Sequence, residues 1–196
     1  VVNNGNLVSA TGATVKNFED VDASASTGKI TIIGTDTDGS ISNALNSKGG
    51  SGDDTISGGS AVDNISGGLG NDILKGFAGN DIISGSSGDD ILDGGEGADT
   101  LAGGDGSDTF VFGSSDLITN SSNQIDTIQD LSPGEKIGID SDLVWKKINA
   151  TDDTAAPTLD DSAKEAYIQK IGGKYLLVIE KAVDGGTKGY VDLGSS

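Results

Sequence analysis

Large apolar side chains recur at every ninth residue through the middle of the chain, between stretches made mostly of Gly, Ser, Asn and Asp. From residue 49 the sequence divides into seven units of nine that end at residue 111. The eighth position of each unit is apolar: Ile56, Ile65, Leu74, Ile83, Leu92, Leu101 and Phe110. Because strand side chains alternate between two faces, the pattern predicts short strands over positions seven to nine, with the eighth side chain facing inward.

The first six positions of each unit predict a turn. Glycine there allows backbone angles that other residues disfavour and leaves the carbonyl group accessible. The first position is always glycine: Gly49, Gly58, Gly67, Gly76, Gly85, Gly94 and Gly103. The fourth is glycine in six units, at Gly52, Gly70, Gly79, Gly88, Gly97 and Gly106, and Ala61 in the other. Phe77 and Ser86 replace glycine at the second position of their units.

The sixth position is aspartate in every unit: Asp54, Asp63, Asp72, Asp81, Asp90, Asp99 and Asp108. If two units make one coil, the turns stack along two edges about 4.8 Å apart. Neighbouring carboxylates would then repel by about 3.5 kcal/mol at an effective dielectric constant near 20. Carboxylate and carbonyl oxygens without nitrogen or sulfur ligands favour Ca²⁺. Five gaps between stacked turns predict about five calcium ions.

The composition narrows the classes of function. The chain has 31 acidic and 12 basic residues, a formal charge of -19, and no His, Cys or Met. This charge disfavours nucleic acids and anionic membranes as partners, and the missing residue types exclude disulfides, thiolate or imidazole metal sites and His- or Cys-based catalytic dyads. Since the repeated carboxylates are assigned to calcium, we expect no enzymatic activity. No apolar run is long enough to span a membrane.

The repeated units resemble the GGxGxDxUx nonapeptides of RTX proteins, which are calcium-binding bacterial exoproteins. The resemblance implies an all-β fold, a right-handed parallel β-roll or β-helix solenoid, with the sixth-position aspartates and turn glycines as calcium ligands. Seven inward side chains are a small core for the block, so we expect it to be unfolded without calcium and to fold as the metal binds. The alternative interpretation is a Gly/Ser/Asp-rich linker that never folds. Such a linker would not explain why an apolar residue occupies the same position in all seven units.

The flanks predict caps at both ends of the solenoid. Residues 1–48, with strand-like runs at 29–33 and 40–42, predict metal-free coils, and residues 112–196 a C-terminal antiparallel β cap. Gly172–Gly173 and Gly185–Gly186 suit hairpin turns, and Trp145, Tyr167, Tyr175 and Leu177 are candidates for the core of the cap. The segment 124–140 resembles the one that follows the roll in secreted metalloproteases, with Asp126 and Asp130 as candidate ligands of a terminal ion.

The segment "NFEDVDASASTGKITIIGT" resembles lead-ins to RTX repeats in bacterial surface proteins, including surface-layer proteins. We therefore expect a structural or assembly part of a secreted S-layer-like protein, partnered by calcium and by further copies of itself or a cell-surface glycan. The resemblance also implies type I secretion, with a signal within residues 140–196. Two alternatives stay open: the secretion and folding tail of an enzyme or toxin, and an adhesin or carbohydrate-binding module.

Overall fold

The structure, a computed structural model, describes the backbone of residues 2–3, 6–7, 13–16, 20–34, 44–113, 125–132, 135–139, 144–145, 165–171, 174–180 and 188–192. The described residues form 19 strands and no helix. No described segment offers a helix long and apolar enough to cross a membrane. The predicted all-β class is confirmed.

The strands form two sheets, of 12 and 7 strands. In spatial order the first contains β1 (Val2–Asn3), β2 (Asn6–Leu7), β4 (Asp20–Asp22), β6 (Asn46–Lys48), β8 (Asn64–Leu69), β10 (Ile82–Ser87), β12 (Thr100–Asp105), β14 (Ile125–Ile128), β19 (Lys188–Asp192), β18 (Lys174–Glu180), β17 (Glu165–Ile171) and β16 (Val144–Trp145). The second contains β15 (Lys136–Ile139), β13 (Thr109–Phe112), β11 (Ile91–Glu96), β9 (Ile73–Ala78), β7 (Thr55–Ser57), β5 (Ile30–Ile33) and β3 (Ala13–Lys16).

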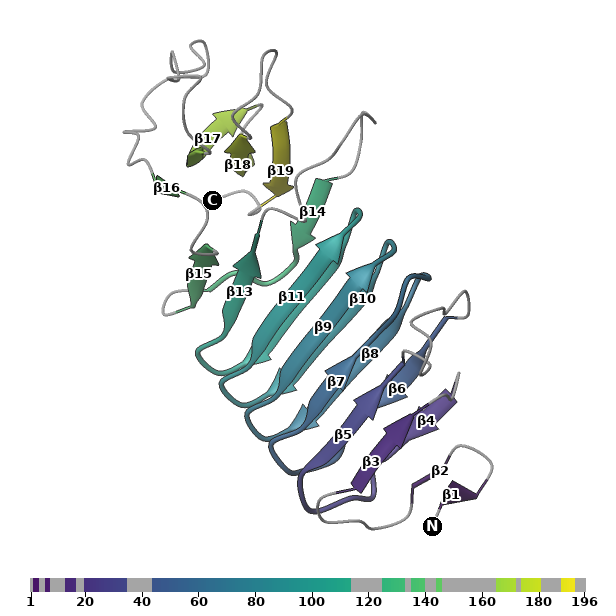
Figure 1. The fold of residues 1–196 in the computed structure, drawn as a ribbon. Helices are drawn as coiled ribbons and strands as arrows, with labels where there is room; N and C mark the ends of the chain where they lie inside the picture. The colour runs from purple at the N-terminus through teal and green to yellow at the C-terminus, as the bar shows by residue number, and fades with distance from the viewer. Residues whose placement is uncertain are drawn as a thin grey trace.

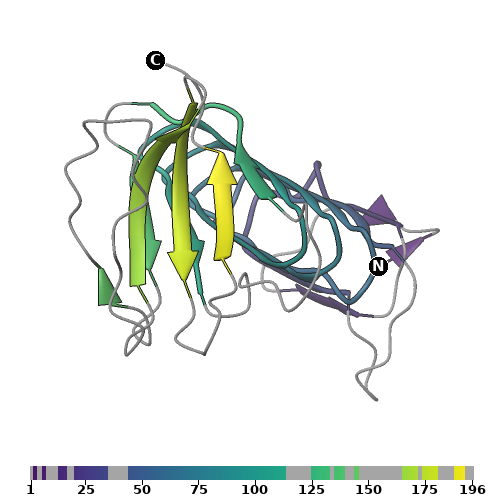
Figure 2. The same ribbon diagram turned by 90° about the horizontal axis from the view of Figure 1, so that it is seen from above.

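The chain alternates between the two sheets and stacks each coil in parallel on the one before (Figure 1). Ile83 pairs with Ile65 on one side and with Leu101 on the other, so each step along the sheet is 18 residues. Leu92 is placed in the same way between Leu74 and Phe110 in the other sheet. The predicted coil of two nonapeptides is therefore confirmed, and Figure 2 shows the coils lined up one behind another.

The core lies between the two sheets and consists mainly of the eighth-position side chains. All seven are at most 1% exposed. Ile30, Ile32 and Leu45 continue this core toward the N-terminus, and Phe112 and Ile128 continue it toward the C-terminus. The nine-residue apolar period thus predicted the inward-facing residues correctly.

The strands are longer than the sequence pattern indicates. In β8 to β12 each strand runs from position seven of one unit to position three of the next, so it includes the first three residues of the predicted turn. The prediction that positions one to six form the turn was wrong for these units, in which positions four to six make the bend. The physical reason is that a parallel ladder pairs backbone groups, and glycine can join it without a side chain to pack.

Coils without the repeat precede the block, as expected. β3 and β5 extend one sheet, and β4 and β6 extend the other, all in parallel register. The predicted strand at 29–33 appears as β5, whereas the run at 40–42 lies outside the described residues.

After the repeats, β17, β18 and β19 are antiparallel and lie at the opposite end of the solenoid from β1 and β2 (Figure 1). Ile171 pairs with Lys174 in the antiparallel ladder, while the residues of the two predicted hairpin turns, 172–173 and 185–186, lie outside the described residues. β19 also pairs in parallel with β14, which joins the antiparallel strands to the roll. The side chains of Trp145, Tyr167, Tyr175 and Leu177 lie outside the described residues.

Candidate calcium-binding turns

The sixth-position aspartates form two columns, one along each edge of the roll. The N–H of each aspartate donates to Oδ1 of the aspartate one coil further on: Asp54 to Asp72 (2.7 Å), Asp72 to Asp90 (2.7 Å) and Asp90 to Asp108 (2.9 Å) on one edge, and Asp63 to Asp81 and Asp81 to Asp99 (both 2.8 Å) on the other. All seven are at most 1% exposed. The structure therefore brings together on two edges the carboxylates that the sequence assigned to them.

The second carboxylate oxygen of these residues faces the turn. Oδ2 of Asp72, Asp81, Asp90 and Asp108 is buried and has no hydrogen-bond partner among the described residues. A buried carboxylate oxygen without a donor is unfavourable by several kcal/mol as an order of magnitude. A positively charged partner near these oxygens would offset this cost.

The first-position glycines leave room for that oxygen. A Cβ atom added at this position would lie 2.1 to 2.3 Å from the aspartate Oδ2 of its own unit in six of the seven units, and 2.6 Å from it at Gly49. None of these glycines has a positive φ. The expectation that every turn glycine supplies an unusual backbone angle was wrong here, because the first position requires glycine for space.

A backbone oxygen of the next coil approaches the same point. The position that a Cβ on Gly67 would take lies 2.1 Å from Asp72 Oδ2 and 2.9 Å from the carbonyl oxygen of Gly85. The same pair recurs at Gly85, with Asp90 Oδ2 at 2.2 Å and the carbonyl oxygen of Gly103 at 2.6 Å. Carboxylate and carbonyl oxygens from neighbouring coils therefore converge between the turns.

The second and fourth positions are where unusual backbone angles occur. From residue 67 onward φ is positive at both positions of every unit: Gly68, Gly70, Phe77, Gly79, Ser86, Gly88, Gly95, Gly97, Gly104 and Gly106. Carbonyl oxygens of one coil also lie close to the glycines of the next coil. A Cβ atom added to Gly88 would lie 2.0 Å from the carbonyl oxygen of Gly70. Gly52, in the first unit, instead approaches the backbone of Gly28 and Lys29.

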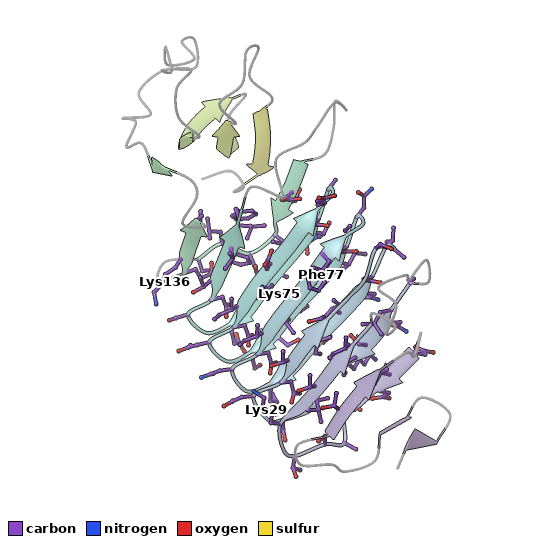
Figure 3. The ribbon with its side chains drawn as sticks, viewed as in Figure 1. Lys29, Lys75, Phe77 and Lys136 are labelled. Atoms are coloured by element: carbon purple, nitrogen blue, oxygen red, sulfur yellow. The ribbon has the colours of Figure 1, made fainter. Side chains whose placement is uncertain are left out.

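Two residues other than glycine adopt these angles, with φ of 75° at Phe77 and 85° at Ser86. Figure 3 shows Phe77 on β9. Such angles cost residues with a Cβ about 1–2 kcal/mol. Replacing Ser86 by Gly is therefore expected to raise stability by about 1 kcal/mol, since the Ser86 Oγ contacts to Ser66 and Ser84 are long, at 3.4 Å.

Thermal unfolding in saturating calcium measures this effect. Ser87→Gly is the matched control, because Ser87 lies in the same strand without a positive φ. That control is expected to lower stability by about 0.5–1 kcal/mol. Equal changes in both variants would contradict strain at residue 86.

Burial disfavours the ionised form of several of these carboxyl groups. It raises the pKa of Asp72 to about 7 and the pKa values of Asp81 and Asp90 to about 6, although a backbone N–H donor to each lowers the pKa in part. The neighbouring carboxylates in the column, Asp54 and Asp90, raise the pKa of Asp72 further. Stacked carboxylates therefore oppose folding at neutral pH unless a cation lies between them.

In the metal-free protein, protonation of these carboxyl groups at low pH is expected to reduce the repulsion that a bound cation would otherwise offset. A carboxyl group whose pKa is higher in the folded than in the unfolded chain favours folding at low pH, and this contribution is lost as pH rises from about 4 to about 7. Chelated protein should therefore gain β signal in far-UV circular dichroism when the pH falls from about 8 to about 5.5. The opposite trend would contradict the raised pKa values.

Among the described side chains, no lysine forms a salt bridge with a sixth-position aspartate. Lys29, Lys75 and Lys136 are exposed and project outward from the roll (Figure 3). The one salt bridge among the described side chains joins Lys75 Nζ to Asp93 Oδ2 at 3.3 Å, outside the core. The donor-free Oδ2 atoms of Asp72, Asp81, Asp90 and Asp108 therefore have no lysine partner among the described residues.

The available ligands fit a hard cation bound partly by the backbone. Among the described residues, no three carboxylates are grouped closely enough to hold a metal by themselves. The oxygens that do converge are one carboxylate oxygen and carbonyl oxygens of stacked turns, without nitrogen or sulfur. Ca²⁺ accepts six to eight such oxygens in flexible geometry, whereas Mg²⁺ requires a strict octahedron and retains water.

Asp126 and Asp130 differ in their roles at the C-terminal end. Asp126 is 3% exposed and accepts the N–H of Asp99 on Oδ1 at 2.8 Å, so it extends one aspartate column. Asp130 accepts the N–H groups of Gly103 (3.0 Å) and Gly104 (2.9 Å) on its two oxygens, so it caps the turn at 103. The sequence predicted both residues as ligands of an ion at the end of the roll. In the structure, Asp126 continues an aspartate column and Asp130 does not.

Glu135 is a residue that the sequence analysis missed. The N–H of Lys136 donates to the carbonyl oxygen of Asp108, just as the N–H of Thr109 donates to that of Asp90, so Glu135 takes the place after Asp108 in the column. Its Oε1 is buried without a hydrogen-bond partner among the described residues, and burial raises its pKa. The available signal was the acid-x-apolar spacing, shared by Glu135–Ile137 and Asp108–Phe110.

Stacked turns with inward aspartates define a parallel β-roll of acidic nonapeptides. The family model described as the RTX calcium-binding nonapeptide repeat, in four copies, matches residues 47–74 and 75–110. Residues 47–110 are therefore RTX repeats, and this part of the chain is a calcium-binding β-roll, a structural module rather than a catalytic fold. No curated protein matches the chain significantly.

Proposed function

We propose that residues 49–111 fold when the exported chain meets extracellular calcium, and that the chain is a structural or assembly part of a secreted, S-layer-like bacterial surface protein. The observation that carries the folding step is the burial of seven aspartates in two columns, with the Oδ2 atoms of Asp72, Asp81, Asp90 and Asp108 buried without a hydrogen-bond donor among the described residues. Folding these carboxylates together requires compensating positive charge.

The proposed ligands are drawn from the sixth-position aspartates and the carbonyl oxygens of first- and fourth-position glycines, with Asp126 at the C-terminal end. Bound calcium supplies positive charge between stacked carboxylates and joins neighbouring coils. The aspartates hold the ion, while the glycines let the backbone approach closely enough to contribute oxygens. Metal binding and folding are then one process.

Export explains why it would be useful for folding to depend on the calcium concentration. Proteins with these repeats are typically secreted. In low cytoplasmic calcium a chain with a formal charge of -19 stays extended, which suits type I secretion, and extracellular calcium modules bind at about 0.1–1 mM. In this proposal residues 1–48 cap the roll, residues 49–111 bind calcium, and residues 112–196 close the other end and contain the secretion signal.

The assembly role is tested by light scattering and electron microscopy while calcium is added to the metal-stripped chain. Sheets or regular oligomers that form together with the β signal would support it. Folded monomers at saturating calcium would exclude self-assembly and favour the folding tail of a secreted enzyme or toxin. Binding of those monomers on a glycan array would instead favour the adhesin alternative.

A further inference from the structure

The seven turns fall into two conformational groups. In the five turns that begin at residue 67 or later, φ is positive at both the second and the fourth positions. In the first two turns, 49–54 and 58–63, all of whose residues the structure describes, no residue has a positive φ. The second turn also has Ala61 in place of the fourth-position glycine, which disfavours the left-handed conformation there.

The carboxylates of the two groups have different partners. Oδ2 of Asp54 accepts the N–H of Gly50 at 2.8 Å, and Oδ2 of Asp63 accepts the N–H of Gly59 at 2.6 Å. Their Oδ1 atoms accept the N–H groups of Ile30 (2.8 Å) and Leu45 (2.7 Å). Both oxygens of each carboxylate therefore have a backbone donor.

Four of the later turns lack this second donor. Oδ2 of Asp72, Asp81, Asp90 and Asp108 is buried with no hydrogen-bond partner among the described residues. The two differences go together in these four turns, since with a positive φ the second residue no longer directs its N–H at the carboxylate. The conformation of the second residue thus decides whether the carboxylate is satisfied by the backbone or left for another partner.

We infer that turns 49–54 and 58–63 hold no calcium, although both match the repeat. An N–H group directed at Oδ2 places positive charge near the point where a cation would bind, and it occupies the oxygen that the cation needs. Ions then lie between turns 67–72, 85–90 and 103–108 on one edge and between turns 76–81 and 94–99 on the other. The number expected from the nonapeptide turns falls from about five to about three.

This inference rests on the proposed calcium function and specifies where the bound stack begins. The first two turns make a metal-independent end of the roll, joined to the N-terminal coils by the Oδ1 bonds from Ile30 and Leu45. The ions start one coil further along each edge.

Paired variants of the full chain test it. Bound calcium per chain is counted by plasma mass spectrometry after dialysis against saturating calcium. Asp54→Asn with Asp63→Asn is expected to keep every ion, whereas Asp72→Asn with Asp81→Asn should lose about two. If all stacked turns bound calcium, the first pair would lose about two ions and the second about four, and the inference would be overturned. Wild-type protein without bound calcium would refute the proposed function itself.

A second measurement covers the case in which a variant does not fold. Terbium replaces calcium in crystals of the unmodified protein, and its anomalous scattering locates the ions. The inference expects peaks from the turn at 67 onward on one edge and from the turn at 76 onward on the other. Peaks between turns 49–54 and 67–72, or between turns 58–63 and 76–81, would overturn it.

Discussion

Replacing Asp90 by Asn is expected to remove about two calcium ions and to raise the calcium concentration at the folding midpoint at least about tenfold. Asp90 lies in the middle of one column, where it accepts the N–H of Asp72 and donates its own N–H to Asp108. Its turn therefore faces both neighbouring gaps. Asparagine keeps the Oδ1 acceptor and nearly the same volume, so the substitution mainly removes the negative charge.

Asp89→Asn is the matched control, because Asp89 is the adjacent residue of the same turn. Its side chain is exposed, and its Oδ1 accepts the N–H of Ser107 at 2.9 Å, an acceptor that asparagine preserves. Calcium titration followed by far-UV circular dichroism gives the two midpoints, and mass spectrometry gives the number of ions. Similar midpoints for the two variants would show that the buried column does not bind the metal.

Replacing Gly97 by Ala is expected to lower stability in saturating calcium by about 3 kcal/mol or more. Gly97 has a φ of 148°, and a Cβ there would lie 1.5 Å from the carbonyl oxygen of Gly79. The obstacle is backbone of the preceding coil, which cannot rotate away as a flexible side chain would. The coils must therefore separate at the edge where the proposed ligands converge.

Gly138→Ala is the control for this substitution. Gly138 lies in β15 without a positive φ, and the nearest atoms to its Cβ would be Thr109 Cγ2 at 3.5 Å and Val111 Cγ2 at 3.6 Å. We expect its melting temperature to stay within about 2 °C of the wild type, and that of Gly97→Ala to fall by roughly 10 °C. Comparable melting of the two variants would contradict the close stacking of the turns.

The nine-residue pattern was sufficient to predict the coil, its two edges and its core. Each inward residue, such as Leu92, lies between equivalents exactly two units away, so one unit determines the contacts of its neighbours. A periodic chain of this kind leaves few alternative registers, because a shift by one residue would expose the whole apolar set. Even Asp126, 27 residues after Asp99, joined the predicted column.

The sequence did not predict strand length or the conformation of individual turns. Glycines in strands carry no side-chain signal, so Gly67 and Gly68 suggested a turn although both lie in β8. Gly50 and Gly68 occupy the same position of their units, yet only Gly68 has a positive φ. The difference arises from the coils on either side, which a single repeat does not encode.

Glu135 shows another limit of the pattern. It replaces aspartate beyond the last nonapeptide, 27 residues after Asp108, where the period of nine is interrupted by residues 113–134. The hydrogen bond from the Lys136 N–H to the carbonyl oxygen of Asp108 nevertheless places Glu135 in line with the aspartate column. Pairing between distant strands, rather than local spacing, determines its place.

Far-UV circular dichroism of the metal-stripped full chain during calcium titration tests most directly the claim that calcium folds the roll, with magnesium as the control. The account predicts a cooperative gain of β signal at about 0.1–1 mM Ca²⁺, with none at the same concentration of Mg²⁺. A spectrum that is already that of the folded roll in chelator at neutral pH, and unchanged by calcium, would contradict it.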